Sequence, residues 1–289
     1  MTCITRFAPS PTGRLHLGHA YSAITAHDFA RAQGGRFLLR IEDIDTTRCR
    51  PEYEQAIFDD LEWLGLTWET PIRRQSDHFA DYAEALEKLR ALGVLYRCFR
   101  TRSEIAEASA SAPQAGDPTG AQDAPILGPI SADEEAERLE RGETFAWRLS
   151  LSCSQDLLGE KFTQLGFRET GAGPNGEQGA ISARPEACGE GILARKDTST
   201  SYHLSVVHDD ALQGVTHVVR GADLFDATPV HVLLQALLGY PTPIYHHHKL
   251  LLGPDGKRFA KRDKSLTLAA LRAEGVTPAD IRRQVGLPT

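Results

Sequence analysis

The segment that most constrains the fold lies at the start of the chain, where residues 6–13 read Arg-Phe-Ala-Pro-Ser-Pro-Thr-Gly and residues 16–19 read His-Leu-Gly-His. We expect residues 4–8 to form a short strand, because the Pro- and Gly-rich stretch that follows predicts a turn. Residues 18–33 are expected to form a helix, since apolar residues recur there at helical spacing before two glycines. The chain thus passes from a strand through a turn into a helix, whose first amide groups point outward unpaired.

The two histidines at this helix start are candidates for binding an anion. The helix macrodipole and the outward-pointing amides favour negative charge at such a position. The imidazoles of His16 and His19, separated by Gly18, suit hydrogen bonding to the phosphates of a nucleotide. Taken alone, a His-x-Gly-His pattern is more often a helix start with exposed histidines.

The first third of the chain alternates strands and helices. After the first helix we expect a strand at residues 37–41, a helix opened by Pro51 and a further helix capped by Ser76. Later in the chain, residues 215–220 are expected to form a strand, and a helix follows with Thr228 as its cap. This order predicts an α/β fold with a parallel sheet and helical crossovers.

The composition changes in the middle of the chain. Residues 106–129 and 171–191 are rich in Ala, Ser, Gly and Pro and are expected to be loops. Between them we expect a helix opened by Ser131 and a strand at residues 145–151.

These patterns predict a division into a core, an insertion and a C-terminal region. The core is expected to comprise residues 1–93 and 191–245, with residues 94–190 as an inserted smaller subdomain. Residues 246–289 form the remainder, ending in two short helices that begin near Thr267 and Thr277.

The composition is that of an ordinary globular enzyme, with 41% hydrophobic and 25% charged residues in a chain of 289. The chain carries no secretory signal and no apolar run of membrane-spanning length, so no membrane partner is expected. Five scattered cysteines indicate a reducing cytoplasm. The net charge of −7 argues against a nucleic acid partner. From Lys249 onward, however, nine basic and four acidic residues give +5, compatible with a phosphate-facing surface or a solvated basic tail.

Four further segments, taken with the first, resemble glutamyl-tRNA synthetases. Residues 16–19 fill the HIGH signature of class I enzymes, and Ala8-Pro9-Ser10-Pro11-Thr12-Gly13 is similar to the glutamyl rather than the glutaminyl branch. The other matching segments are residues 39–45, residues 202–210, residues 214–223, and Gly256-Lys257-Arg258-Phe259-Ala260-Lys261-Arg262, which occupies the place of the KMSKS loop. The resemblance covers most of the chain outside 94–190. It implies a Rossmann-like catalytic core, an inserted acceptor-binding-like α/β subdomain and a short helical C-terminal region.

The resemblance also assigns roles to individual residues. Glutamate has an amine and two carboxylates, so its pocket needs an acid and a guanidinium. Glu42 is expected to hold the α-amine and Arg220 the side-chain carboxylate, and the site is completed by Arg6, Phe7, Ala8, Pro9, Ser10 and Tyr202. Without the resemblance, an ion pair of Glu42 with Arg40 or Arg48 and a surface salt bridge at Arg220 would be preferred.

The expected ATP-binding residues are His16, Gly18, His19 and Lys261, of which His16, His19 and Lys261 are also expected to be catalytic. Lys261 would contact the ATP phosphates, with Mg²⁺ as the partner of ATP. The sequence departs from the KMSKS pattern at Phe259 and Ala260, and Ala260 lacks the usual hydroxyl.

The chain ends soon after Lys261, where a glutamyl-tRNA synthetase would continue into an anticodon-binding domain. This resembles the glutamyl-queuosine tRNA(Asp) synthetases, truncated paralogues that use ATP to attach L-glutamate to queuosine at the wobble position of tRNA(Asp). The expected partners are therefore glutamate, ATP and that tRNA, bound by a cytoplasmic monomer. Two alternatives remain: a truncated glutamyl-tRNA synthetase that charges a tRNA 3′ end, and a non-catalytic tRNA-binding paralogue.

No metal site is expected in the protein itself. The paralogue family often holds zinc through a Cys-x-Cys pair, but Cys98-Phe99-Arg100 keeps only the first cysteine and no other lies before Cys153. His246-His247-His248 suggests a metal, yet adjacent residues of a strand point to opposite faces and cannot all reach one ion. A structural or nucleotide-side role is expected for these histidines.

Overall fold

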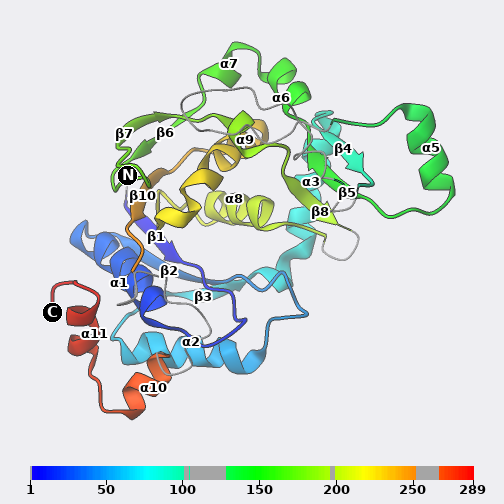
Figure 1. Ribbon diagram of the computed structural model, residues 1–289. Helices are drawn as coiled ribbons and strands as arrows, with labels where there is room; N and C mark the ends of the chain where they lie inside the picture. The colour runs from blue at the N-terminus through cyan, green and yellow to red at the C-terminus, as the bar shows by residue number, and fades with distance from the viewer. Residues whose placement is uncertain (1, 101–103, 105–127, 196–198, 252–266) are drawn as a thin grey trace.

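The computed structural model describes residues 2–100, 104, 128–195, 199–251 and 267–289. Its centre is a mostly parallel sheet made of two groups of hydrogen-bonded strands, one of three strands and one of four (Figure 1). The Thr216 amide donates to the Ile4 carbonyl at 3.0 Å and joins the two groups of strands side by side. In their order across the sheet, the strands are β3 (Glu69–Arg74), β2 (Arg36–Ile41), β1 (Ile4–Phe7), β9 (His217–Gly221), β10 (Ile244–His248), β6 (Gly166–Glu169) and β7 (Gly179–Ser182). Only the β6–β7 pair is antiparallel, which confirms the predicted α/β fold.

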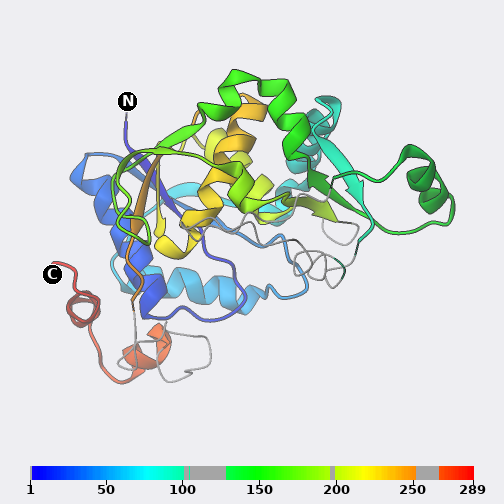
Figure 2. The same ribbon diagram turned by 45° about the horizontal axis from the view of Figure 1, so that its top comes forward.

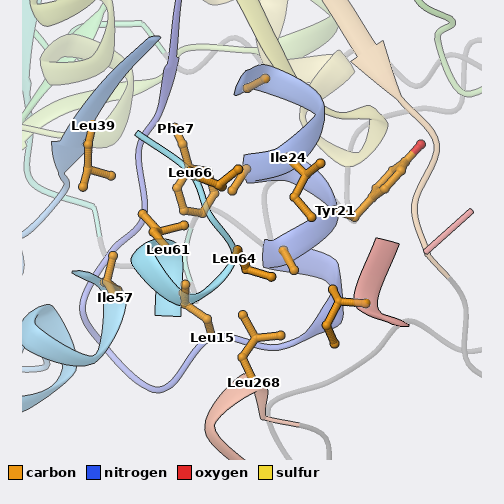
Figure 3. Packing of buried hydrophobic residues seen from close by; sticks show 14 of the residues in the cluster. Phe7, Leu15, Tyr21, Ile24, Leu39, Ile57, Leu61, Leu64, Leu66 and Leu268 are labelled. Carbon is orange, nitrogen blue, oxygen red and sulfur yellow. The ribbon is translucent and has the colours of Figure 1, made fainter. Parts of the chain in front are cut away.

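Helices cover both faces of this sheet. On one face lie α1 (Leu17–Ala32), α2 (Pro51–Trp63), α10 (Leu268–Ala273) and α11 (Pro278–Gln284). On the other lie α3 (Phe79–Ala91), α8 (Tyr202–Leu212) and α9 (Thr228–Leu238). Phe37, Leu39 and Ile41 of β2 pack on the α1 side, as Figure 3 shows for Leu39. The intervening Leu38 packs on the opposite side, as the two-residue period of a strand requires.

The second sheet is small and antiparallel. It consists of β4 (Leu95–Cys98), β5 (Ala146–Leu149) and β8 (Ile192–Arg195). Beside it are α5 (Ala132–Glu140), α6 (Leu151–Leu158) and α7 (Glu160–Thr163), with α5 standing away from the body in both views (Figures 1 and 2). The described residues also form three short 3-10 helices, η1 (Gln75–His78), η2 (Pro185–Cys188) and η3 (Ala222–Ala227).

The strands do not pair as the expected boundaries of the inserted subdomain would require. Within residues 94–190, β6 and β7 extend the core sheet beside β10, because Phe167 and Glu169 alternate with an exposed arginine and are buried there. Conversely, β8 was expected in the core but pairs with β5 of the small sheet. The Gly-rich composition of residues 171–191 concealed β7, and residues 106–127 lie outside the described part of the chain.

The helix starts expected at Ser131, Thr267 and Thr277 are confirmed, whereas the caps expected at Ser76 and Thr228 are wrong. Ser131, Thr267 and Thr277 each accept a hydrogen bond from an amide in the first turn of their helices. Ser76 instead lies in η1, where its amide and hydroxyl both bind Asp43, and α3 begins only at Phe79. Thr228 is already inside α9, and its hydroxyl accepts a hydrogen bond from Arg220 at 2.7 Å. In the described chain, no helix combines the length and apolar character needed to cross a membrane.

Asp60 is a buried carboxyl on α2. It is 1% exposed, and neither of its oxygens has a hydrogen-bond partner among the described residues, while Arg272 of α10 lies 3.8 Å away. Burial raises the pKa of this carboxyl to about 6. A pKa raised on folding means that Asp60 lowers the free energy of unfolding as pH rises from about 4 to above 6.

We therefore expect Asp60→Asn to increase the free energy of unfolding at pH 7.5 by about 1–2 kcal/mol, with little gain at pH 4. Urea denaturation at the two pH values measures this. Glu62→Gln, at an exposed position on the same helix, is the matched control. An equal effect of Asp60→Asn at both pH values would contradict the raised pKa.

Candidate active site

A cavity of about 420 Å³ lies beyond the carboxyl ends of β1 and β9, at the start of α1. The order of the parallel strands reverses between β1 and β9, which is where α/β sheets bind ligands. Of the residues proposed from the sequence, those lining this cavity are Arg6, Phe7, Ala8, His16, Gly18, His19, Glu42, Tyr202 and Arg220.

Two of the remaining proposed residues, Pro9 and Ser10, do not line this cavity. Ser10 lines a second, neighbouring cavity, and Pro9 is buried with its carbonyl accepting from the Glu42 amide at 3.0 Å. Lys261, Phe259 and Ala260 fall outside the described residues.

The start of α1 presents two imidazoles to the cavity. The His16 Nδ1 atom accepts from the Gly18 amide at 3.1 Å, and the His19 Nδ1 atom accepts from the His16 amide at 3.2 Å. Because both Nδ1 atoms are acceptors, each ring carries its proton on Nε2 and donates from there. A Cβ atom at position 18 would lie 3.0 Å from the His16 ring, so glycine permits this arrangement.

Two guanidinium groups and two carboxylates form a buried network beside the imidazoles. Arg6 binds Asp210 of α8 through two hydrogen bonds of 3.0 and 3.2 Å, and Arg40 binds the same carboxylate at 2.8 Å. Glu42 lies 3.3 Å from Arg40, so the ion pair that was considered as an alternative is present within the cavity wall. Burial raises the pKa of Glu42 despite the guanidinium groups of Arg40 and Arg6. Burial also opposes the ionisation of Asp210, but the same two groups outweigh it and lower its pKa.

Arg220 is buried and bound mostly by neutral groups. Its Nε donates to His247 Nε2 at 3.0 Å, and its Nη1 lies 3.2 Å from His231 Nδ1. Its Nη2 donates to the Leu224 carbonyl and to the Thr228 hydroxyl. In the part of the chain that the structure describes, no carboxylate lies within ion-pairing distance of Arg220. The surface salt bridge considered from the sequence is therefore not seen, and a buried positive charge faces the cavity.

Sequence reasoning did not identify the residues that hold Arg220. The run of three histidines in the sequence was the one available sign of these residues. Adjacent side chains of β10 point to opposite faces of the sheet. His247 therefore bonds to Arg220 and Glu169, whereas His246 bonds to Thr170 on the other face. His248 bonds to Ser22 at 2.9 Å and lines the cavity. Among the described residues, no group of three or more side chains is arranged to hold a metal ion.

A second cavity, of about 750 Å³, adjoins the first between the core and the small sheet. Glu42 and Tyr202 line both cavities. Three arginines also border the second cavity, Arg48 from the core and Arg148 and Arg195 from the small sheet. Glu42, Asp45 and Glu190 line this cavity as well, and Arg48 pairs with Asp45, so it presents both positive and negative groups next to the first cavity.

The surroundings of Cys98 do not fit a zinc ion. Cys98 lines a small hollow together with Arg97, Arg100, Glu134 and Arg138, and none of the other described residues that line it is a Cys or His. Arg97 stacks on Trp147, with 4.9 Å between the guanidinium carbon and the ring centroid. A structural zinc site needs four Cys or His ligands, which the described residues do not supply here.

The fold and the first cavity define a nucleotide-binding core of the class I synthetase type. Residues 2–287 match the family of tRNA synthetases class I (E and Q), catalytic domain, and the chain belongs to this family. The chain is similar to a glutamyl-Q tRNA(Asp) synthetase of Rhodobacter capsulatus, with 53% identity over 98% of this chain and 100% of the relative. A second relative of that name, from Symbiobacterium thermophilum, is 40% identical over 96% of this chain and 83% of its own length.

Glutamate–tRNA ligases are also similar, over part of their length. Glutamate–tRNA ligase 2 of Dinoroseobacter shibae is 40% identical over 95% of this chain but 58% of the relative. The solved glutamate-tRNA synthetase of Elizabethkingia anophelis has a TM-score of 0.71 at 27% identity, over 91% of this chain and 53% of that one. The chain thus spans about half the length of that structure.

Proposed function

We propose that this protein activates L-glutamate with ATP to form glutamyl-adenylate. The observation that carries the proposal is Arg220, a buried guanidinium in the cavity with no carboxylate partner among the described residues. A ligand carboxylate would compensate this charge, whereas the neutral amide of glutamine would not. Glu42 lines the same cavity and can hold the ammonium group of an amino acid.

Activation requires the glutamate carboxylate to attack the α-phosphate of ATP. Synthetases of class I use ATP, and the residues of such a site mainly align the reactants and stabilise developing negative charge. The Nε2–H groups of His16 and His19 can donate to phosphate oxygens, and the start of α1 adds its dipole. Mg²⁺ would accompany ATP through its phosphates rather than through a protein cage.

Lys261 is proposed to supply further positive charge to the phosphates. The segment that carries it is bounded by two described residues at the site: Leu251 lines the cavity and Thr267 pairs with His16. We expect Lys261→Ala to lower kcat for glutamate-dependent ATP–pyrophosphate exchange by about 10²- to 10³-fold and to change the KM for glutamate by less than about threefold. Lys264→Ala is the control within the same segment. An unchanged kcat in Lys261→Ala would remove this lysine from the catalytic residues.

The acceptor is proposed to be queuosine at the wobble position of tRNA(Asp). Support comes from the 53% identity to a glutamyl-Q tRNA(Asp) synthetase over that relative's whole length. The arginine-bordered second cavity can admit a nucleotide next to the first cavity. We propose the small sheet and its helices as the unit that contacts this tRNA, with the protein acting as a monomer in the cytoplasm.

Transfer of labelled glutamate to tRNA(Asp) with and without queuosine tests this acceptor. We expect transfer only to the queuosine-containing tRNA, with the label retained after the 3′ end is removed. Label lost with the 3′ end would indicate a glutamyl-tRNA synthetase instead. If glutamate supports no ATP–pyrophosphate exchange, with or without tRNA, the protein is a binding paralogue and the proposal fails.

A further inference from the structure

Two imidazoles hold the guanidinium of Arg220, and the geometry assigns their tautomers. An arginine can only donate hydrogen bonds, so His247 Nε2 and His231 Nδ1 must both be acceptors. His247 therefore carries its proton on Nδ1, and His231 carries its proton on Nε2. The His231 Nε2–H group donates to His203 Nδ1 at 3.0 Å. Each imidazole thus has one defined donor and one defined acceptor.

Glu169 on β6 determines the tautomer of His247. Its Oε2 atom accepts from His247 Nδ1 at 2.5 Å, and both side chains are fully buried. Its Oε1 atom accepts from the backbone amides of His247 and Gly171, at 2.9 and 2.7 Å. A Cβ atom at position 171 would lie 2.1 Å from the His247 carbonyl oxygen, so glycine allows the two segments to approach this closely. Both carboxylate oxygens are therefore occupied.

We propose that Glu169 is a positioning residue for recognition of the substrate side chain: through His247 it fixes the direction in which Arg220 donates. This inference rests on the proposed glutamate activation and adds residues that contact no substrate.

The hydrogen bonds of Arg220 show why its direction matters. One N–H of Nε binds His247, two of Nη2 bind Leu224 and Thr228, and one of Nη1 binds His231. Of the five N–H groups of an arginine, one on Nη1 is left for the ligand carboxylate. Recognition then depends on a single direction, because the usual two-pronged contact would break a bond to the protein.

The same arrangement keeps negative charge away from the position where the ligand carboxylate would bind Arg220. The Glu169 carboxylate lies on the far side of His247 and partly offsets the Arg220 charge without occupying the cavity. A carboxylate bound directly to Arg220 would instead compete with the substrate. His247 therefore transmits the influence of Glu169 while leaving Arg220 available.

Glu169→Gln tests the relay. The two backbone amides retain the amide oxygen of glutamine at the Oε1 position, which places its NH₂ group against His247 Nδ1. The Nδ1 atom of His247 must then accept a hydrogen bond, so the His247 proton moves to Nε2. There it faces the Nε–H group of Arg220, which is also a donor. We expect the KM for glutamate in ATP–pyrophosphate exchange to rise about 10- to 100-fold, with a much smaller change in kcat.

Nitrogen-15 NMR of the histidine side chains should show His247 with its proton on Nδ1 in the wild type and on Nε2 in Glu169→Gln. His246→Asn is the control, because His246 lies on the same strand but outside the cavity and should keep the wild-type KM. An unchanged KM in Glu169→Gln, or an unchanged His247 tautomer, would overturn the proposal.

A double-mutant cycle keeps the test decisive if Glu169→Gln weakens the fold. The glutamine in His247→Gln has an amide oxygen for Arg220 and no tautomer, so adding Glu169→Gln to it should raise the KM by less than about threefold. Additive effects of the two substitutions would show that Glu169 acts independently of His247 and would refute the relay. If the wild-type protein itself shows no glutamate-dependent exchange, the proposed function fails rather than the relay.

Discussion

Replacing Arg220 with alanine is expected to lower kcat/KM for glutamate in ATP–pyrophosphate exchange by about 10²- to 10⁴-fold, the loss that follows when a buried charge is left without its partner. The substrate carboxylate would enter the cavity without a guanidinium to compensate it. Most of the loss should be in KM, because Arg220 is proposed to contact the side chain of glutamate rather than its reacting carboxylate. Discrimination against glutamine should weaken at the same time, since it depends on that charge.

Arg220→Lys and Arg168→Ala make this result specific. Lysine keeps the charge, but its single nitrogen cannot bind His231, His247 and Thr228 together, so an intermediate activity is expected. Arg168 is exposed on β6, and its removal should leave the kinetics unchanged. Wild-type kcat/KM in Arg220→Ala would exclude this residue from the glutamate site.

Glu42→Gln is expected to lower kcat/KM for glutamate by about 10²- to 10³-fold, because the α-ammonium loses its only proposed carboxylate partner. The fold should persist, since Arg40 keeps its bond to Asp210 at 2.8 Å. Circular dichroism and urea denaturation check the fold, and Glu52→Gln, exposed on α2, is the control. Normal exchange kinetics in Glu42→Gln would refute the assignment.

The pH dependence of the wild type provides an independent check on Glu42. Burial raises the pKa of this carboxyl, so it takes up a proton at a higher pH than an ordinary glutamate. Only the ionised form can hold an ammonium group, so kcat/KM for glutamate should fall as pH decreases through the raised pKa. We expect the fall of kcat/KM at low pH to be absent from Glu42→Gln. If the fall persists in this variant, another titrating group causes it.

Much of the site was predictable because its parts are local in sequence. Arg6 in β1 and His16 and His19 at the start of α1 all lie within residues 6–19. The phosphate-binding chemistry of the two histidines could be read from their residue types, whereas Arg6 was assigned by resemblance. Glu42, which directly follows β2, was assigned by resemblance, because its residue type alone favoured an ion pair with Arg40 or Arg48. Arg220 was assigned by resemblance, and the structure places it in the same cavity.

The residues that hold Arg220 could not be predicted because they depend on strand order. Glu169 lies in a segment expected to belong to the insertion, and no local pattern shows that β6 pairs with β10. His247 was recognised only as one of three adjacent histidines, whose alternation was predicted but whose partners come from other strands. Asp60 is similar: its helix was predicted, but no local pattern shows that its carboxylate is buried without a hydrogen-bond partner among the described residues, with Arg272 of α10 3.8 Å away.

The wall shared by the two cavities has a consequence for reaction timing. Acyl-adenylates hydrolyse readily in water, so an enzyme that releases one wastes ATP. Because Glu42 and Tyr202 border both cavities, an adenylate formed in the first would meet an acceptor in the second without leaving the protein. The two half-reactions would then be coupled by proximity, and a change at Tyr202 would alter the rates of both.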